Sequence, residues 1–178
     1  MNEDFILSLK PLGSEVEDKE LFIEYKKRIG HLLPNFPECA LENWIYRHHS
    51  DIDDYAFLDF QKMKFQEKSW SKDEIFNNIK SYESGMIDNL GYHIYESDDP
   101  NWLQKYMLTH NTWNVPIIVF QNDSPLNIPI IAFEEDFPDM GKPYHLLEGH
   151  LRLNYFREMY RKEKERLNDN HKLWLVTI

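Results

Sequence analysis

The segment 144-YHLLEGHLRLNYFREMY-160 joins an apolar run to an amphipathic stretch through a single glycine. Its first residues are apolar and aromatic, as in a short buried strand. After Gly149 the apolar positions cover one side of a helix, and the basic residues fall on the other. The pattern therefore predicts a strand over 143–149, a sharp turn at Gly149 and a helix over 150–167.

The residues at this turn are types that bind anions. Gly149 lets the backbone turn sharply and bring its N–H close to a ligand. A helix starting near His150 directs unpaired N–H groups and the positive end of its dipole at the same point. Arg152 can donate two hydrogen bonds to phosphate or carboxylate oxygens, and His150 can donate to them or move a proton. Glu148 can hold a ribose hydroxyl or a metal, or act as a base. We expect Gly149, His150 and Arg152 to bind a phosphate, with Glu148 and His150 as candidate catalytic residues.

Helices and strands are both predicted along the rest of the chain, in runs rather than in strict alternation, so we expect an α+β fold. Ser71 and Glu74 form a capping box that predicts a helix ending at Gly85 or Gly91. The other predicted elements are helices over 17–33, 38–49 and 102–108, and strands within 51–65 and over 116–123, 129–136 and 171–178.

With this order of elements, residues 55–178 resemble the ParB/sulfiredoxin-like superfamily, whose signature is a strand running into an acid-Gly-x-x-Arg turn that opens a helix. The matching residues are Leu147, Glu148, Gly149, His150 and Arg152, and 112-TWNVPIIVFQND-123 resembles the family's strand after its first helix. The resemblance implies a small mixed sheet with packed helices over 55–178, preceded by a helical N-terminal extension over 1–54.

The resemblance also implies a nucleotide ligand, ATP or CTP with Mg²⁺, and a small phosphotransferase or nucleotide hydrolase. Sulfiredoxins need a cysteine where His150 stands, so that activity is not expected. The serine-kinase branch carries Asp-Gly-His-His-Arg, and Leu151 replaces its second histidine. Trp113 is a candidate to flank the ligand. A further catalytic acid is expected among Glu134, Glu135 and Asp136.

Composition limits the partners. The chain of 178 residues has a net charge of −11, which argues against an extended nucleic-acid surface. Leu151 to Lys172 is the exception, with seven basic and four acidic residues. That stretch either holds a small anion or is a solvated helix with ion pairs along it. Cys39 is the single cysteine, which excludes an internal disulfide, and the histidines show no metal-ligand spacing, so no metal site is predicted.

The start of the sequence has acidic residues where a signal peptide needs basic ones, and no apolar run is long enough to span a membrane. We therefore expect a cytoplasmic protein without membrane contact. The acidic charge also supports a second hypothesis, an immunity protein or antitoxin that neutralises a basic toxin by direct binding, without catalysis.

Overall fold

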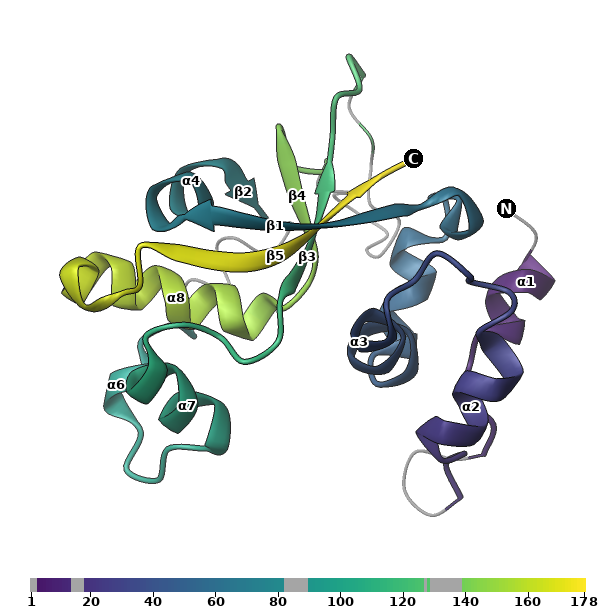
Figure 1. The fold of residues 1–178 in the computed structure, drawn as a ribbon, viewed down its shortest axis with the longest axis horizontal. Coiled ribbons are helices and arrows are strands. Elements are labelled where there is room, and N and C mark those ends of the chain that lie inside the picture. Colours follow the sequence, from purple (N-terminus) through teal and green to yellow (C-terminus); the bar gives the residue numbers. More distant parts are fainter. Residues whose placement is uncertain (1–2, 14–17, 82–89, 127, 129–138) are drawn as a thin grey trace. The chain divides into compact units, whose positions relative to one another are not determined.

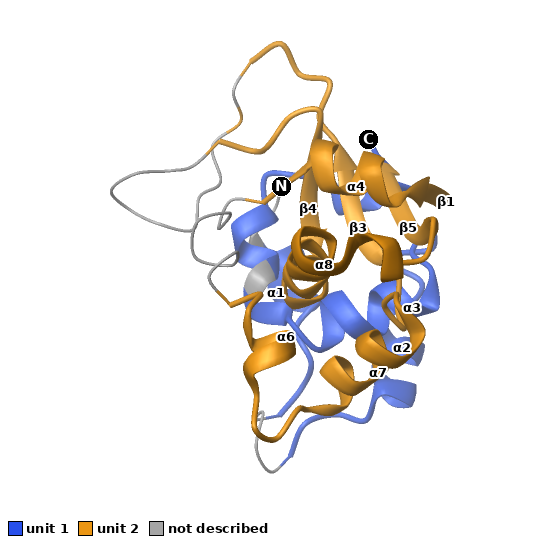
Figure 2. Ribbon diagram, turned by 90° about the vertical axis from the view of Figure 1, so that its left-hand side faces the viewer, with its two compact units in different colours: residues 1–65, 129–138, 177–178 blue, residues 66–128, 139–176 orange. Residues whose placement is uncertain are grey.

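The computed structural model describes residues 3–13, 18–81, 90–126, 128 and 139–178. The fold is α+β, with a five-stranded mixed sheet and several helices. The chain divides into two compact units (Figure 2), formed by residues 1–65, 129–138 and 177–178 (unit 1) and by residues 66–128 and 139–176 (unit 2). Within the described residues, no helix has both the length and the apolar character needed to cross a bilayer.

Unit 1 is built mainly from short helices, which are α1 (Glu3–Ser8), α2 (Phe22–Ile29), α3 (Glu38–Ala40), the π-helical η1 (Leu41–Tyr46) and the 3-10 helices η2 (His49–Tyr55) and η3 (Phe60–Lys62). Strand β1 (Lys64–Ser71) begins in unit 1 and continues into unit 2. The helices of unit 2 are α4 (Lys72–Asn78), α6 (His93–Glu96), α7 (Trp102–His110), α8 (His150–Glu163) and the 3-10 helix η4 (Lys164–Arg166). Its other strands are β2 (Ile79–Lys80), β3 (Ile117–Gln121), β4 (Tyr144–Glu148) and β5 (Asn170–Thr177).

The sheet has the strand order β1-β5-β3-β4-β2 (Figure 1). β3 is parallel to β5 and antiparallel to β4, and β2 is parallel to β4. The central strand β3 is apolar on both faces, since its first four residues are all buried. Such continuous burial is expected of a strand covered on both sides.

Helix α8 organises unit 2, because α4, α6, α7 and η4 all contact it. Its buried face packs Leu153, Phe156 and Met159 into the core of the unit, together with Ile117 and Val119 of β3. Arg157 of α8 is also buried and donates from Nη2 to the carbonyl of Ile79 at 2.8 Å, which ties the helix to β2. Through these contacts α8 packs against the sheet and against the shorter helices of unit 2.

Most elements of unit 2 agree with the sequence. The predicted strands at 116–123, 143–149 and 171–178 are β3, β4 and β5, and the helices predicted at 102–108 and 150–167 are α7 and α8. The capping box is present, with Ser71 Oγ accepting from the Glu74 N–H at 3.2 Å. The helix that it starts is shorter than predicted, however. It ends at Asn78 because Ile79 and Lys80 pair as a strand with β4. The predicted strand over 129–136 lies outside the described residues.

The strand predicted within 51–65 was wrong for most of its length. Residues 49–55 and 60–62 are 3-10 helices, and β1 starts only at Lys64. Phe60 and Met63 are buried in this region, and Ile52, Tyr55 and Leu58 before them are buried at a spacing of three residues. That spacing matches the period of a 3-10 helix, in which residues three apart lie on the same side. The closely spaced aromatic residues suggested an alternating strand, while the buried positions from Ile52 to Leu58 follow the helical period.

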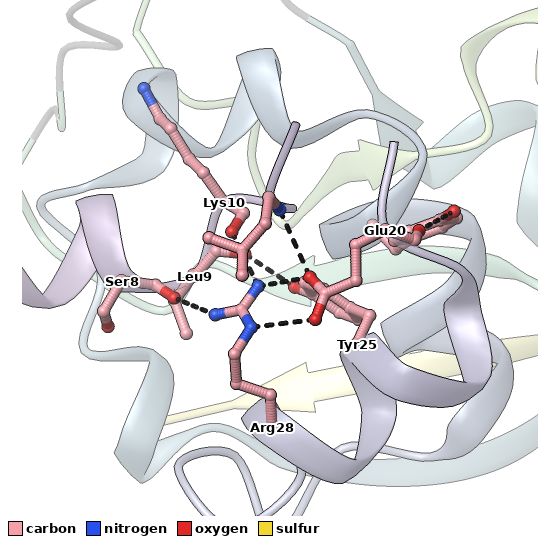
Figure 3. Close-up of polar contacts among 8 residues, drawn as sticks. Ser8, Leu9, Lys10, Glu20, Tyr25 and Arg28 are labelled. Atoms are coloured by element: carbon pink, nitrogen blue, oxygen red, sulfur yellow. Dashed lines mark hydrogen bonds and ion pairs between the residues drawn. The ribbon is translucent and has the colours of Figure 1, made fainter. Parts of the chain in front are cut away.

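Helix α2 is also shorter than the predicted range of 17–33, and Arg28 connects it to the chain before it (Figure 3). Arg28 donates from Nε and Nη2 to the two carboxylate oxygens of Glu20, at 3.0 and 2.6 Å. The same guanidinium donates to the carbonyls of Ser8 and Lys10, both at 3.0 Å. Arg28 lowers the pKa of the Glu20 carboxyl through this hydrogen bond. The forked pair thus connects α2 to two segments that precede it in the sequence.

His171 of β5 is an uncharged group inside unit 2. It is 1% exposed, its Nδ1 lies 2.8 Å from Thr112 Oγ1, and its ring packs against Trp113 and Phe156. Burial lowers the pKa of His171 to about 4. The folded protein therefore keeps this imidazole neutral at pH values where an exposed histidine would gain a proton.

We expect Arg28→Ala to lower the free energy of unfolding of the protein by about 2–4 kcal/mol, because Glu20 and two backbone carbonyls lose a charged donor. Urea unfolding followed by circular dichroism measures the change. Lys27→Ala is the matched control on the same helix, since Lys27 and Glu24 form an exposed pair and its loss should cost less than about 0.5 kcal/mol. Equal effects of the two variants would contradict the structural role of Arg28.

The buried His171 predicts a loss of stability in acid. Its folded pKa of about 4 lies below the ordinary value of 6.5, so the unfolded chain binds more protons between these values. The free energy of unfolding should fall as the pH drops from about 6.5 towards 4, by up to about 3 kcal/mol from this group. In His171→Gln the slope of stability against pH over this range should become shallower. Exposed His110→Gln should keep the wild-type slope, and an unchanged slope in His171→Gln would refute the assignment.

Candidate functional site

The turn between β4 and α8 requires glycine for two reasons. Gly149 is the N-cap of α8 and has a φ of +103°, in the left-handed region that side chains disfavour. A Cβ at this position would also lie 2.5 Å from Ile117 Cγ2. Ile117 belongs to β3, the antiparallel neighbour of β4. The predicted sharp turn at Gly149 is therefore present, and a neighbouring strand occupies the space beside it.

Glu148 and Arg152 form an ion pair on either side of this glycine. Arg152 Nη2 donates to Glu148 Oε2, and Arg152 Nη1 donates to the carbonyl of Val115 at 3.0 Å. Both charged residues are 8% exposed. The guanidinium thus joins the end of β4, the first turn of α8 and the chain just before β3. Two of its nitrogens already donate hydrogen bonds inside the protein. Arg152 therefore does not extend towards a ligand as a bidentate donor, as the sequence suggested.

The first turn of α8 carries the other anion-binding feature. The N-cap residue, Gly149, has no side chain that could cap this end of the helix, and no acidic residue stands in its first turn. The intrahelical hydrogen bonds begin with the Leu153 N–H, which donates to the Gly149 carbonyl at 2.9 Å. The N–H groups of the three preceding residues therefore have no acceptor within the helix. Leu151 is 39% exposed, so this end of α8 reaches the protein surface.

Two histidines lie close to the turn. His145 of β4 is fully buried and accepts a hydrogen bond at Nδ1 from the Gly141 N–H at 2.9 Å, which leaves the proton of the neutral ring on Nε2. Burial lowers the pKa of His145 to about 3, and the charge of His150 contributes in the same direction. His150 itself is half-buried in the first turn of α8. The two rings are thus electrostatic neighbours, and His145 stays neutral beside His150.

The remaining predicted site residues lie elsewhere or are not described. Trp113 is 5% exposed, packs against Phe156 and donates from its indole N–H to the Lys172 carbonyl at 2.7 Å. Its ring belongs to the core, so a ligand at the turn would meet little of it. The candidate acids Glu134, Glu135 and Asp136 lie outside the described residues. In the described part of the chain, no group of three or more His, Cys, Asp or Glu side chains is arranged to hold a metal ion.

The basic residues that follow the turn are paired with acids. Ion pairs along α8, η4 and β5 include Lys162–Glu158, Lys164–Asp73, Arg166–Glu163 and Lys172–Glu67, at 2.6 to 3.0 Å. Of the two interpretations of this basic stretch, the solvated helix with ion pairs matches the structure. An anion would meet uncompensated positive potential at the start of α8 rather than along its length.

Two contacts of the site have little or no signature in the sequence. The Val115 acceptor is a backbone carbonyl, which any residue type supplies. Ile117 reads as an ordinary strand residue, and its contact with Gly149 depends on the pairing of β3 with β4. The Glu148–Arg152 pair did have a signal, because charges of opposite sign four residues apart often meet at a helix start.

Comparisons with protein-family models, with characterised proteins and with solved structures gave no match. The geometry of the site is therefore the basis for assigning a function.

We expect Gly149→Ala to destabilise the protein by about 2–4 kcal/mol, since the new methyl group meets Ile117 and forces a left-handed residue. Thermal or urea unfolding measures this loss. In Gly149→Ala/Ile117→Ala the same glycine change should cost less than it does when Ile117 is present, because the contact is relieved. A cost that is the same with and without Ile117 would mean that the backbone angle alone requires glycine.

Proposed function

We propose that unit 2 binds a phosphate-bearing ligand, of the class of ATP or CTP, at the start of α8. The observation that carries the proposal is that α8 starts from a left-handed glycine, an N-cap without a side chain, and has no acidic residue in its first turn. Backbone N–H groups at such a helix start, with the positive end of the helix dipole, form an anion site. The exposure of Leu151 indicates that a ligand can reach this end of the helix.

Arg152 supports this role as a positioning residue. An isolated carboxylate at Glu148, one residue before the helix, would repel a phosphate. The ion pair with Arg152 cancels that charge and leaves the helix start as the local source of positive potential. The second hydrogen bond of Arg152, to Val115, fixes the pair relative to β3.

Catalysis at this site is an extension of the same proposal. His150 stands in the first turn, where its ring can donate to a phosphate oxygen or carry a proton. Glu148 is engaged by Arg152, so a role as base requires that pair to open. Mg²⁺ would be carried to the site by the phosphates of the nucleotide. Phosphoryl transfer and nucleotide hydrolysis are the reaction classes that fit this arrangement.

A charge cycle at the pair tests the proposal. Glu148→Gln leaves the arginine charge uncompensated and should raise phosphate affinity, while Arg152→Gln leaves the carboxylate and should lower it. Each change should be about tenfold, as a unit charge roughly 6 Å from the ligand contributes about 1–3 kcal/mol. The double variant Glu148→Gln/Arg152→Gln should bind much as the wild type does. Calorimetric titration with ATP, CTP and inorganic phosphate, with and without Mg²⁺, provides the affinities.

Folding must be separated from binding in this experiment. Each single variant leaves one buried charge without its partner, which costs stability, so circular dichroism should establish that each is folded at the titration temperature. Arg161→Gln is the matched control, an exposed arginine further along α8. The absence of any phosphate ligand for both wild type and Glu148→Gln would reject the proposal. Affinity changes of the same sign in the two single variants would show that folding, not charge, was being measured.

A second proposal is an acidic protein that neutralises a basic partner such as a toxin. It is favoured by the pairing described above: the exposed cations of α8 and η4 are engaged by acids, while the chain as a whole carries −11. Such a protein would attract a basic partner, and the association would weaken as salt is added.

A further inference from the structure

The α6–α7 segment of unit 2 exposes a tryptophan beside a run of acids. Trp102 is the first residue of α7 and is 62% exposed. The residues that lead to it, 96-ESDDPNW-102, include three exposed carboxylates, Glu96, Asp98 and Asp99. Figure 1 shows α6 and α7 next to each other in unit 2. We call Glu96, Asp98, Asp99 and Trp102 the acidic tryptophan surface.

Trp102 is exposed in a fixed position. Asn101 caps α7 by accepting from the Gln104 N–H at 3.0 Å, and Gln104 Oε1 accepts in return from the Asn101 N–H at 2.6 Å. Gln104 Nε2 also donates to the carbonyl of His93 at 2.6 Å, which connects α7 to α6. Leu103 and Met107 anchor the opposite side of α7 in the core. The helix therefore cannot turn Trp102 inward without withdrawing these two residues.

The charge around Trp102 is negative. Asp99 and Lys105 lie 4.0 Å apart, and Glu96 and Lys162 lie 3.9 Å apart, both at the limit of an ion pair and on exposed side chains. Pairs of this kind contribute little and leave the carboxylates accessible to another cation. In the described part of the chain, Asp98 takes part in no ion pair. The tryptophan thus stands beside carboxylates that are weakly neutralised.

We propose that the acidic tryptophan surface docks a basic, arginine- or lysine-rich segment of a partner protein. A guanidinium or ammonium group stacks on the indole face through a cation–π interaction, and the three carboxylates accept its hydrogen bonds and those of its neighbours. Exposed tryptophans are frequent anchors of protein interfaces, and acidic neighbours steer a basic partner towards them. The proposal is independent of the phosphate site, because this surface repels anions.

Charge complementarity selects this occupant over others. A second copy of the chain would bring the same three carboxylates, and a net charge of −11, against the surface. Nucleic acid and free nucleotides are repelled for the same reason. A basic protein segment combines a favourable charge with a flat cation that fits the exposed ring.

The test uses the full chain and a short synthetic peptide rich in arginine and leucine, carrying a fluorescent label. Anisotropy titrations give its dissociation constant at low and at physiological salt. Trp102→Ala should weaken binding about tenfold, the effect expected of an aromatic anchor. Asp98→Asn/Asp99→Asn should weaken it to a similar degree at low salt, and the difference from the wild type should shrink as salt screens the charges.

Matched controls separate local docking from attraction by net charge. Asp139→Asn/Glu165→Gln removes the same number of charges from exposed positions elsewhere, and Leu126→Ala removes an apolar side chain that is 73% exposed. Both should change the affinity by less than about twofold if docking is local.

Three results would overturn the proposal. The first is no binding of the peptide to the wild type. The second is equal weakening by Asp98→Asn/Asp99→Asn and Asp139→Asn/Glu165→Gln, which would mean attraction by net charge alone. The third is a dimer of the chain, detected by sedimentation, that Trp102→Ala dissociates, because the occupant would then be a second copy.

Discussion

The close approach of β3 to the end of β4 is the constraint on which unit 2 depends. Ile117 occupies the volume that a side chain at position 149 would need, and only glycine allows β4 to turn into α8 at this point. The turn sets the direction of α8, and α8 in turn contacts α4, α6, α7 and η4. A single steric requirement therefore connects the sheet, the long helix and the start of that helix, where the backbone N–H groups lack intrahelical acceptors. The same turn that makes the packing possible creates the feature from which a ligand site is inferred.

Charged groups in this protein have different consequences depending on their burial. Arg152 and Arg157 of α8 are buried and act as connectors, since each donates to a backbone carbonyl of another segment. Arg28 does the same in unit 1, with Glu20 as its carboxylate partner. Arginines that are buried, as in α8, or half-buried, as Arg28 is, are costly to leave unpaired, so their partners are as important as the residues themselves. The exposed cations of α8 and η4 contribute little to stability. They matter because they neutralise nearby acids, whereas Asp99 has only the 4.0 Å contact with Lys105 and Asp98 takes part in no ion pair within the described residues.

The proposed ligand site and the acidic tryptophan surface of unit 2 favour ligands of opposite charge. The start of α8 favours an anion because of aligned backbone dipoles, a source of potential that does not require a basic side chain. The α6–α7 segment favours a cation because of carboxylates and an aromatic face. A protein with this arrangement can bind a phosphate ligand and a basic protein without the two competing for the same groups. The formal net charge, in which acidic residues outnumber basic ones, accounts for the attraction of a basic protein. It does not account for the preference for an anion at the start of α8.

The sequence by itself determined the α+β class, strands β3, β4 and β5, helix α8 and the glycine turn before it, because these depend on local periodicity and on the conformational freedom of one residue. It also placed Glu148 and Arg152 at a spacing where they meet. It did not determine the structure within 51–65, where Ile52, Tyr55 and Leu58 are buried at a three-residue period among closely spaced aromatic side chains. Nor did it predict the end of α4, which pairing with β4 decides. Only the tertiary structure decided that Arg152 is held by Val115, that Trp113 is buried and that Trp102 is exposed, because these depend on which segments lie beside each residue after folding.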